Sequence, residues 1–493
     1  MYDVIITGSG LGGLECGVIL SKEGYKVCVL EKHHIIGGCL QSFKRNGIIF
    51  DTGIHYVGSL SEGQIFNQYN KYLGIADKLH LKKMDEDGFD VIHFEGQQYV
   101  YAMGIDKFQN TLQERFPNEK DNLRKYCGML ADTGQSISIE NLRKGFLSSG
   151  DLTLFSLSAY ETIANTIKDR TLQNILAGTL GLYAGDKCST NLYHHAMVHY
   201  SNIEGAYRLV NGTQQWADVL ADQIRRNGGE VFTDSEVTGI KIKDGIATGV
   251  VINGNEEINS KYIISSIHPA TTFDLVEKNP FIKKAYLTRL HSLSNSCGMF
   301  TVYLAYKKEN FPYINKNHNI YTTNNIWDNF KQTCDGKVAS VFMSMQAMEN
   351  SQYNIVTLLF PVSFAQMEKW TDTKSGHRGN DYIEFKERKK NEALNLAAQF
   401  FPALAHNIEY CYTASPLTYR DYTGVPDGSA YGIVKDYHFP IATLMRVKTR
   451  IANLFLTGQN VNVHGALGVT LTAAHTCAEF LGKEYLAKKV GSI

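Results

Sequence analysis

The residues best suited to chemistry stand near the start of the chain, in the glycine cluster Gly8-Ser9-Gly10-Leu11-Gly12-Gly13. An apolar run at residues 2–7 precedes the cluster, and a helix-like segment at 14–22 follows it. A second apolar run at 26–30 ends on Glu31. The glycines allow a tight turn beside a pyrophosphate, the helix start offers N–H groups to the phosphates, and the carboxylate suits ribose hydroxyls. The pattern predicts dinucleotide binding, with an ordinary βαβ unit as the alternative.

A second glycine pair, Gly37-Gly38, follows the acid closely, and residues 46–56 read Asn-Gly-Ile-Ile-Phe-Asp-Thr-Gly-Ile-His-Tyr. This continuation resembles the FAD-binding start of the superfamily of phytoene desaturases, carotenoid isomerases and amine oxidases. The resemblance implies that Gly37-Gly38 passes beside the flavin pyrophosphate and ribityl chain. It also implies that Gly53 brings the chain to the isoalloxazine ring and that Lys32, like the acid before it, binds the cofactor.

A second strand–glycine–helix pattern occupies residues 453–488. A strand at 453–457 runs into Gly458-Gln459, and Gly468-Val469 stands just before a helix expected at 471–488. Free N–H groups at such a helix start suit an anion. In the flavoenzymes that the chain resembles, this helix start faces the N1/O2 edge of the flavin and stabilises the negative charge of the reduced ring.

The middle of the chain returns to the pattern of the first domain. A helix at 214–227 ends at two glycines, and strands are expected at 230–233, 236–242, 247–252 and 261–266. In the resembled superfamily this segment completes the FAD domain, and the backbone at Val237 contacts the adenine. Without the resemblance, Val237 reads as a core valine.

Together with these patterns, the resemblance implies an α/β protein in which an FAD-binding Rossmann-like domain of the glutathione-reductase type is interleaved with an α+β substrate domain. The FAD-binding domain is expected at residues 1–80, 205–274 and 441–493. The substrate domain is expected at residues 81–204 and 275–440. The cleft between the two domains is the expected site.

The substrate domain shows strand and helix patterns and one irregular stretch. We expect paired strands at 89–94 and 98–101, helices at 106–116 and 382–401, mostly helical structure at 120–204, and strands at 299–306 and 354–360. Residues 413–432 concentrate tyrosine, proline and glycine without helix or strand periodicity. We interpret them as a loop that forms a wall of the site, with a purely structural loop as the alternative.

Reduction of a conjugated double bond needs a hydride from reduced flavin N5, a proton from an acid and a dry apolar cavity. The candidates for side chains near the flavin ring are His55, Tyr56, Tyr431 and His464. His55 or Tyr431 is the candidate proton donor. For each of the four, a structural role is the alternative.

Three histidines, His194, His195 and His199, invite comparison with a metal site, because the last two are one helical turn apart. No HExxH pattern, carboxylate pair or cysteine ligand completes such a site. The sequence therefore predicts no metal, and it favours packed or hydrogen-bonded histidines.

Short motifs along nearly the whole chain point to one branch of the superfamily. They stand at residues 31–33, 37–39, 50–58, 115–117, 378–382, 415–418, 430–432 and 456–459. In this order they resemble the retinol saturases, a family of the carotenoid desaturase/isomerase branch whose members use FAD to saturate one double bond of a conjugated isoprenoid. The chain departs from that pattern at 209–211, which read Leu-Val-Asn, and at Asn460, where aspartate is usual. The departures leave the substrate open.

The length and composition exclude several classes of protein. A length of 493 residues predicts two or three domains, and a formal net charge of zero with a pI near 7.2 argues against nucleic-acid binding. Nine cysteines without a CxxC pair predict free thiols in a reducing compartment. No long apolar run exists and the βαβ unit begins at residue 2, so we expect a cytoplasmic protein without a leader.

An apolar patch at Phe146-Leu147 and 152–157 has two interpretations. It is a peripheral contact with a membrane or a substrate mouth, or it is the face of a helix that packs on the core. The second interpretation is favoured because the stretch lacks a strongly basic face.

The sequence thus predicts an FAD-dependent oxidoreductase that saturates a carbon–carbon double bond of a retinoid-like or carotenoid-like isoprenoid lipid. A carotenoid-type desaturase or cis–trans isomerase is the first alternative. An amine oxidase-like enzyme and a non-catalytic lipid-binding flavoprotein are the others. The expected partner is a hydrophobic small molecule. No second GxGxxG motif is present, so the electron donor is left open.

Overall fold

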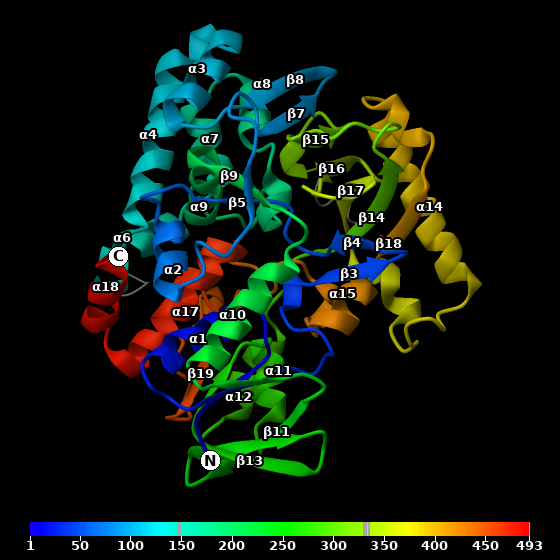
Figure 1. Ribbon diagram of the computed structural model, residues 1–493. Helices are drawn as coiled ribbons and strands as arrows, with labels where there is room; N and C mark the ends of the chain where they lie inside the picture. Colours follow the sequence, from blue (N-terminus) through cyan, green and yellow to red (C-terminus); the bar gives the residue numbers. More distant parts are fainter. Residues whose placement is uncertain (145–148, 329–332, 334–335, 493) are drawn as a thin grey trace.

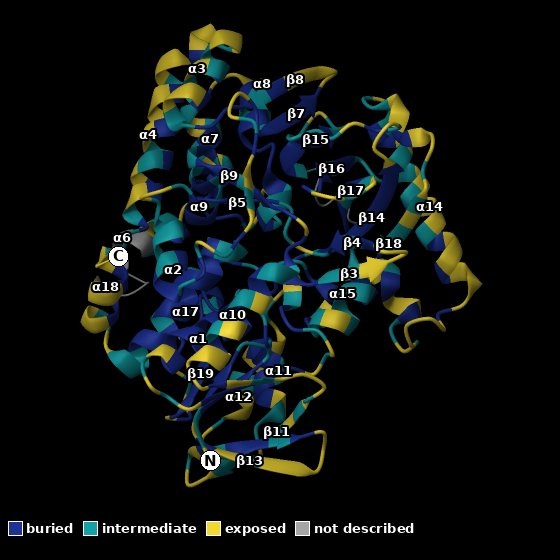
Figure 2. Cartoon of the chain, viewed as in Figure 1, coloured by how far each residue is buried: buried dark blue, intermediate teal, exposed yellow. Residues whose placement is uncertain are grey.

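Two seven-stranded sheets organise the chain (Figure 1). The structure, a computed structural model, describes residues 1–144, 149–328, 333 and 336–492. Two smaller sheets contain two and three strands. Dark blue strands and inner helices in Figure 2 mark the buried interior, whereas yellow residues follow the outer faces of helices.

The first sheet holds the glycine cluster at the end of its central strand. Its strands are β1 (Tyr2–Thr7), β2 (Val27–Leu30), β10 (Glu230–Phe232), β11 (Val237–Lys243), β12 (Ile246–Ile252), β13 (Glu256–Ser265) and β19 (Leu454–Leu456). The order is β10-β2-β1-β13-β12-β11, and β19 also pairs with β13. The pairs among β10, β2, β1, β13 and β19 are parallel, whereas β11, β12 and β13 form antiparallel pairs.

Helices cover both faces of this sheet. Helices α1 (Leu11–Lys22), α10 (Gln214–Arg226) and α17 (Gly465–Leu481) pack together on one face, where Ile6 and Trp216 are fully buried. The opposite face, which includes the alternate residue Ile5, packs against α11 (Pro269–Leu275) and α12 (Lys284–His291). The alternation of Ile5 and Ile6 between two cores is what a strand buried on both faces requires.

The second sheet is mixed. Its strands are β7 (Asp90–Phe94), β8 (Gln97–Tyr101), β14 (Gly298–Lys307), β15 (Asn317–Tyr321), β16 (Ser340–Met345), β17 (Tyr353–Val362) and β18 (Tyr410–Ala414). The order is β18-β14-β17-β16-β15-β7-β8, and only the β15–β7 pair is parallel among these described strands. Helix α14 (Asn380–Ala398) packs on β16 and β17.

The remaining elements surround these sheets. The small sheets contain β3 (Ser42–Arg45), β4 (Ile48–Asp51), β5 (Val57–Gly58), β6 (Leu81–Lys83) and β9 (Ala206–Leu209). The other helices are α2 (Ile65–Leu73), α3 (Ile105–Arg115), α4 (Lys120–Ser136), α5 (Ile139–Lys144), α6 (Ser149–Phe155), α7 (Ala159–Thr166), α8 (Arg170–Leu176), α9 (Leu192–Glu204), α15 (Pro416–Thr423), α16 (Pro440–Thr443) and α18 (Lys483–Gly491).

The strands of the first sheet come from the three segments predicted to form an FAD-binding domain. Those of the second sheet come from the two segments assigned to a substrate domain. The division of the chain into two domains stays a prediction. The three-stranded sheet crosses it, because β6 pairs with β9 of the neighbouring segment.

The stretch at 413–432 is not the irregular loop that was expected. Residues 416–423 form α15, with Pro416 in its first turn and a capping box between Ser415 and Thr418. Gly424 ends the helix in a left-handed conformation at φ +69°. The helix is short and carries the turn residues proline and glycine at both ends, which hid its periodicity in the sequence.

The last helix is also not continuous. Two helices, α17 and α18, replace the single helix expected at 471–488, because Gly482 between them adopts φ +86°. In addition, α17 begins at Gly465, earlier than expected, and so starts directly at the loop that follows β19. The paired strands at 89–94 and 98–101 are confirmed as β7 and β8.

Three further expectations concern thiols and membranes. Seven cysteines are free among the described residues, but Cys297 is disulfide-bonded, so the expectation of free thiols throughout is wrong.

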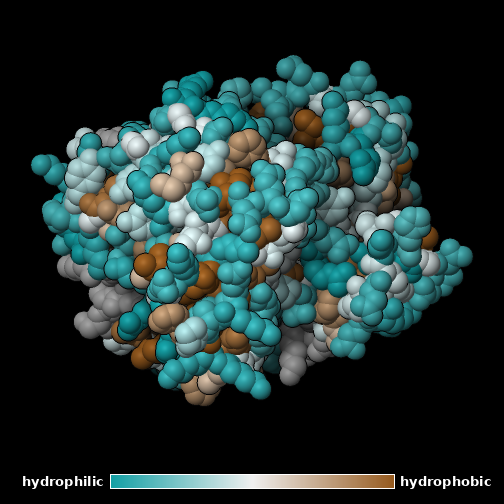
Figure 3. Space-filling model, turned by 90° about the horizontal axis from the view of Figure 1, so that it is seen from below, coloured by the Kyte–Doolittle hydropathy of each residue, from teal (hydrophilic) through white to brown (hydrophobic). Residues whose placement is uncertain are grey.

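Of the apolar patch, Phe146-Leu147 lies outside the described residues, whereas Phe155 is 1% exposed and stacks on Tyr193 in the core. Within the described ranges, no helix has the length and apolar character to span a bilayer. On the face seen in Figure 3, hydrophobic side chains form small separate groups among hydrophilic ones.

Candidate active site

The glycine cluster turns the chain from β1 into α1. Gly8 has φ +89°, a conformation that favours glycine. A Cβ at Gly13 would stand 2.2 Å from the Gly8 carbonyl oxygen, so this approach of helix and strand excludes any side chain. Gly10, the N-cap of α1, provides no side-chain cap. The first N–H groups of α1 are therefore left for a ligand, as in anion sites at helix N-termini.

Two other glycine segments close around this turn. Gly10 and Gly37 form a parallel β-bridge, and a Cβ at Gly38 would lie 3.2 Å from the Gly10 Cα. A Cβ at Gly12 would lie 3.1 Å from the Gly458 Cα, where α1 crosses the loop after β19. Backbone from three distant segments therefore forms one surface without side chains, which is what close approach to a pyrophosphate requires.

Glu31 stands at the end of β2 and is 8% exposed. The Ser9 N–H and hydroxyl donate to its Oε2 at 3.0 and 2.6 Å, and the His33 N–H donates to its Oε1 at 2.9 Å. A carboxylate offers about four acceptor positions. These three bonds fix the side chain and leave capacity for a ribose hydroxyl.

A cavity of about 340 Å³ lies along these elements. Most residues predicted to bind the cofactor line it, namely Gly8, Gly10, Leu11, Gly12, Glu31, Lys32, Gly37, Gly38, Gly53, Val237, Gly458, Gln459 and Val469. Gly13 and Gly468, also predicted as cofactor-binding residues, are not in this lining. A Cβ at Gly468 would meet the Val463 side chain at 2.7 Å, so both glycines serve close packing.

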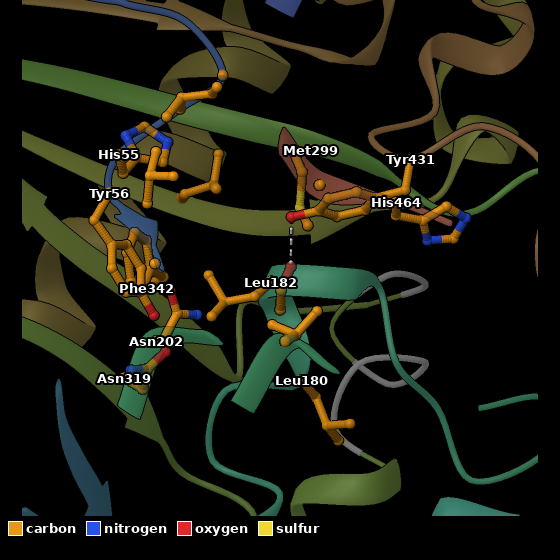
Figure 4. Close-up of a pocket in the computed structure, with 18 of the residues that line it drawn as sticks. His55, Tyr56, Leu180, Leu182, Asn202, Met299, Asn319, Phe342, Tyr431 and His464 are labelled. Atoms are coloured by element: carbon orange, nitrogen blue, oxygen red, sulfur yellow. Dashed lines mark hydrogen bonds between the residues drawn. The ribbon is translucent and has the colours of Figure 1, made fainter. Parts of the chain in front are cut away.

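A second cavity, of about 180 Å³, adjoins the first. The residues that line both are Gly53, Ile54, His55, Met299, Leu359, Tyr431, Gly465 and Ala466. The smaller cavity is mostly apolar, with Leu180, Leu182 and Phe342 in its wall (Figure 4). None of its lining residues in the described part of the chain is Asp, Glu, Lys or Arg. The arrangement suits a neutral, apolar ligand that meets the occupant of the larger cavity.

Tyr431 and His464 lie side by side at one end of the smaller cavity (Figure 4). Their ring centroids are 5.7 Å apart at an interplanar angle of 27°. The Tyr431 hydroxyl donates to the Gly181 carbonyl oxygen at 3.2 Å. Burial raises the pKa of Tyr431 above its ordinary value near 10, so the phenol keeps its proton. Of the two, only Tyr431 also lines the larger cavity.

His464 is the N-cap of α17 and has no side-chain bond to the helix. Its Nε2 donates to the Ile433 carbonyl oxygen at 3.2 Å, and burial lowers the pKa of the imidazole to about 3. The ring is therefore neutral. Gly465 and Ala466, the first residues of α17, line both cavities, so the positive end of this helix faces their junction.

His55 lies at the same junction. Its Nε2 is buried and has no hydrogen-bond partner among the described residues, and its carbonyl oxygen accepts a bond from Arg208 at 3.3 Å. Burial, with the Arg208 charge as a second cause, lowers the pKa of His55 to about 4. The imidazole is therefore neutral, and the buried Nε2 is not open to either cavity.

Tyr56 lines only the smaller cavity, and its hydroxyl donates to Asp90 Oδ2 at 2.6 Å. Asp90 is fully buried, and burial raises the pKa of its carboxyl to about 6. Burial also raises the pKa of Tyr56 well above its ordinary value. All four predicted catalytic candidates therefore line the smaller cavity, and His55 and Tyr431 also line the larger one.

The three neighbouring histidines have protein partners. His195 bonds to the hydroxyls of Tyr126 and Tyr183 at 2.7 and 2.8 Å, and His199 bonds to Thr179 at 3.0 Å. The Nδ1 of His194 donates to the Asn191 side chain at 3.0 Å. The described residues contain no group of three or more ligands that could hold a metal.

Several residues that line the two cavities were not predicted from the sequence. They are ordinary hydrophobic or amide side chains from separate elements, including Leu180, Asn202, Met299, Asn319 and Phe342. Tyr419 and Tyr422 of α15 line the larger cavity. The stretch around α15 was correctly predicted to form a wall, although its structure was not.

Fold and site together define an α/β oxidoreductase with a Rossmann-like nucleotide-binding sheet. A family model described as flavin containing amine oxidoreductase matches residues 11–353. The chain belongs to this family and is a flavin-dependent enzyme.

Similar proteins extend over nearly the whole chain. All-trans-retinol 13,14-reductase of Danio rerio is 28% identical over 97% of this chain and 86% of its own length. Prolycopene isomerase 2 of an Oncidium hybrid cultivar is 25% identical over 87% of this chain and 75% of its own. The crystal structure of an oxidoreductase from Methanosarcina mazei has the same fold, with a TM-score of 0.65, 16% identity and coverage of 96% of this chain and 98% of that one.

The residues present fit a flavin. The glycine surface would hold a pyrophosphate, and Glu31 would hold a ribose. The uncapped start of α17 would face the polar edge of the ring system at the junction. A cavity that continues past these groups leaves room for a substrate.

Proposed function

We propose that the flavin is FAD and that the enzyme reduces a carbon–carbon double bond of a conjugated isoprenoid lipid. The observation that carries the proposal is the junction of the two cavities, where a nucleotide-sized site opens onto an apolar one. The adenosine half of FAD accounts for Glu31 and Val237, which line the larger cavity but not the smaller one. The names of the similar retinol reductases and prolycopene isomerases support a polyene substrate.

The chemistry divides between cofactor and protein. Reduced flavin supplies the hydride for the double bond. Tyr431 holds a proton at the junction and is the proposed donor to the second carbon, while His55 forms part of the junction wall as a neutral ring. The apolar walls exclude water, which protects the reduced cofactor and the intermediate charge.

A charged amine substrate is less well supported. A protonated amine in an apolar cavity is best stabilised by a carboxylate, and the described lining of the smaller cavity contains none. The retained alternative is cis–trans isomerisation of a carotenoid-like polyene, for which the prolycopene isomerase similarity is the supporting observation.

An anaerobic titration tests the proposal. The purified protein, with FAD confirmed by its spectrum, is reduced with dithionite and mixed with all-trans-retinol or a carotenoid while flavin and polyene absorbance are followed. Reoxidation of the flavin together with a shift of the polyene band to shorter wavelength is expected. A polyene shift without net flavin oxidation favours isomerisation, and no response to any polyene contradicts the proposal.

We also propose a cytoplasmic protein that touches membranes peripherally, because such lipids partition into bilayers. Phe439 and Ile441, beside and within α16, are 66% and 77% exposed and would provide the contact. Liposome co-sedimentation is expected to fall in a Phe439→Ser/Ile441→Ser variant and to be unchanged in Phe281→Ser, at a separate exposed site. Equal sedimentation of all three proteins would refute this role.

A further inference from the structure

A buried lysine lies behind the junction of the two cavities. Lys435 is 4% exposed and stands in the segment between Tyr431 and α16. Its ammonium donates to the carbonyl oxygens of Thr443, Asn460 and Val461 at 3.0, 2.7 and 3.4 Å. These acceptors use the three N–H donors of the ammonium, but none of them carries a charge. Its hydrogen bonds are therefore satisfied while its charge is not.

The surroundings of Lys435 supply no anion. Burial lowers the pKa of its ammonium to about 7, and no Asp or Glu side chain of the described chain opposes that shift. The titratable groups that face it are His194 of α9, His268 before α11 and His464 at the start of α17. Burial lowers the pKa of each of these rings, so they are uncharged at neutral pH. A buried cation without a counter-charge is costly, so a bound anion would be stabilised here.

The contacts of Lys435 place its charge beside both cavities. Asn460, whose carbonyl oxygen it bonds, lines the larger cavity in the loop between Gly458 and the start of α17. Lys435 and His464 line a small cavity of about 20 Å³, and His464 also lines the apolar cavity next to Tyr431 (Figure 4). The ammonium is thus one backbone segment from the larger cavity and one side chain from the smaller. A negative charge that develops in an occupant of the junction would be stabilised by it.

The side chain of Asn460 leaves this charge uncompensated. The proteins that the chain resembles usually carry aspartate at this position, whereas here an uncharged amide accepts from the Ile433 N–H at 3.1 Å. A carboxylate at position 460 would stand on a residue that Lys435 already contacts, and it would offset the charge of the ammonium. The loop before α17 therefore keeps its positive charge.

We propose that Lys435 is a positioning residue of the flavin site, whose unpaired charge is balanced by the negative charge that the flavin ring gains on reduction. Two electrons and one proton, from dithionite and water in the test below, convert the uncharged oxidised ring into an anion. The ammonium therefore favours the reduced ring over the oxidised one. The inference goes beyond the proposed function, because it needs only the flavin that the family establishes and not the polyene.

Sulfite binding and the midpoint potential of the bound flavin test this charge. The sulfur of sulfite forms a bond to flavin N5, and the displaced electron pair becomes negative charge at the N1/O2 edge. Its Kd therefore reports how well the site holds an anionic ring. At pH 6, where Lys435 is protonated, we expect Lys435→Met to raise the sulfite Kd about 10-fold. The midpoint potential should fall by about 30 mV, the equivalent of ten-fold for a two-electron couple. The Kd of oxidised flavin should change little.

Matched variants separate the charge from the packing. Lys435→Gln keeps N–H donors for the carbonyl oxygens and should behave as Lys435→Met does, whereas Lys435→Arg keeps the charge and should resemble the wild-type protein. Asn460→Asp should shift the sulfite Kd and the potential in the same direction as Lys435→Met. Lys389, a lysine of α14 that is 3% exposed and lines neither cavity, provides the control. Lys389→Met should leave both quantities unchanged.

The outcomes are distinct. Unchanged sulfite affinity and potential in the Met and Gln variants of Lys435 overturn the inference. Weaker binding of oxidised flavin at an unchanged potential assigns the lysine to the pyrophosphate and also overturns it. Failure of both variants to load flavin does the same, because the inference assigns the charge to the reduced state. A lowered potential in an enzyme that reacts with no polyene supports the inference while the proposed function fails.

Discussion

Tyr431 and His55 share the junction of the cavities but differ in what they can do with a proton. Burial raises the pKa of Tyr431 and lowers that of His55 to about 4, so the phenol is protonated and the imidazole is uncharged at pH 7. A neutral imidazole is a poor acid, whereas a phenol beside a developing carbanion has a proton to give. Sequence motifs could nominate both residues, but the assignment between them needs their burial.

Replacement of Tyr431 by phenylalanine tests this assignment. The ring that stacks on His464 is kept, and only the hydroxyl is lost. Loss of a general acid typically slows a reaction by 10²- to 10⁴-fold, so we expect kcat to fall by about 100-fold with KM changed little. Single-turnover reoxidation of reduced flavin by the polyene measures the step. A rate within three-fold of wild type would exclude Tyr431 as donor.

A second prediction for a single residue concerns Glu15 and the pH dependence of stability. It is 1% exposed on α1, bonds to the Thr470 hydroxyl at 2.6 Å, and burial raises the pKa of its carboxyl from about 4.5 to about 8. Between these values the folded carboxyl is protonated and the unfolded one is ionised. Folding therefore takes up a proton, and stability falls by about 1.4 kcal/mol per pH unit as pH rises through this window.

The change Glu15→Gln removes that proton uptake. The melting temperature of the variant should exceed that of wild type at pH 8 to 9, and the difference should shrink toward pH 5. Glu114→Gln, at an exposed position of α3, is the control and should follow the wild-type curve. Parallel curves for wild type and Glu15→Gln would mean that Glu15 does not titrate in this range.

Among the elements, those with local signals were predictable and those set by distant contacts were not. The β1–α1–β2 unit follows from apolar runs and glycines within about 30 residues of sequence, and its order is that of a known mononucleotide-binding unit. The break at Gly482 and the helix α15 were not predicted. Glycine and proline occur at the ends of helices as well as in loops, so their presence did not tell one from the other. The apolar cavity could not be predicted, since Asn319, Phe342 and Leu180 are common residues that only the fold brings together.

The contact between α1 and β1 permits a test with glycine substitutions. Gly13→Ala would place a Cβ 2.2 Å from the Gly8 carbonyl oxygen, so helix and strand must separate. We expect a protein that loses flavin and melts at least 5 °C lower. Gly128→Ala, on α4 with no atom within 4 Å of the added Cβ, should load flavin normally and gain about 0.5–1 kcal/mol from helix propensity. Flavin absorbance and thermal melting report both. Normal loading by Gly13→Ala would show that the turn tolerates a side chain.

The whole molecule buries many uncharged histidines. Burial lowers the pKa values of His55 and His93 to about 4 and those of His199, His318 and His464 to about 3. The unfolded chain binds protons at these rings near pH 6.5, while the folded protein does not. Their contribution to stability is therefore present above pH 6.5 and is lost as pH falls toward 4, because proton uptake favours the unfolded chain.

We expect the melting temperature to fall steeply between pH 6.5 and 5. The slope of stability against pH should depend on the buried histidine rings. His318 bonds to His93 at 2.9 Å between β15 and β7, and His318→Gln should reduce the slope by up to about 1.4 kcal/mol per pH unit. His377→Gln, at an exposed position, is the control. Equal slopes for wild type and both variants would contradict the argument.

The first sheet also constrains how the protein is made. Its parallel core joins β1 to β13 and then to β19, so β1 is synthesised more than 400 residues before the last of these strands. The larger cavity likewise needs Gly8 and Val469. A nascent chain therefore has no complete cofactor site until Val469 has been synthesised. Flavin capture must follow that point, and the exposed βαβ unit needs protection from aggregation until its distant partners are made.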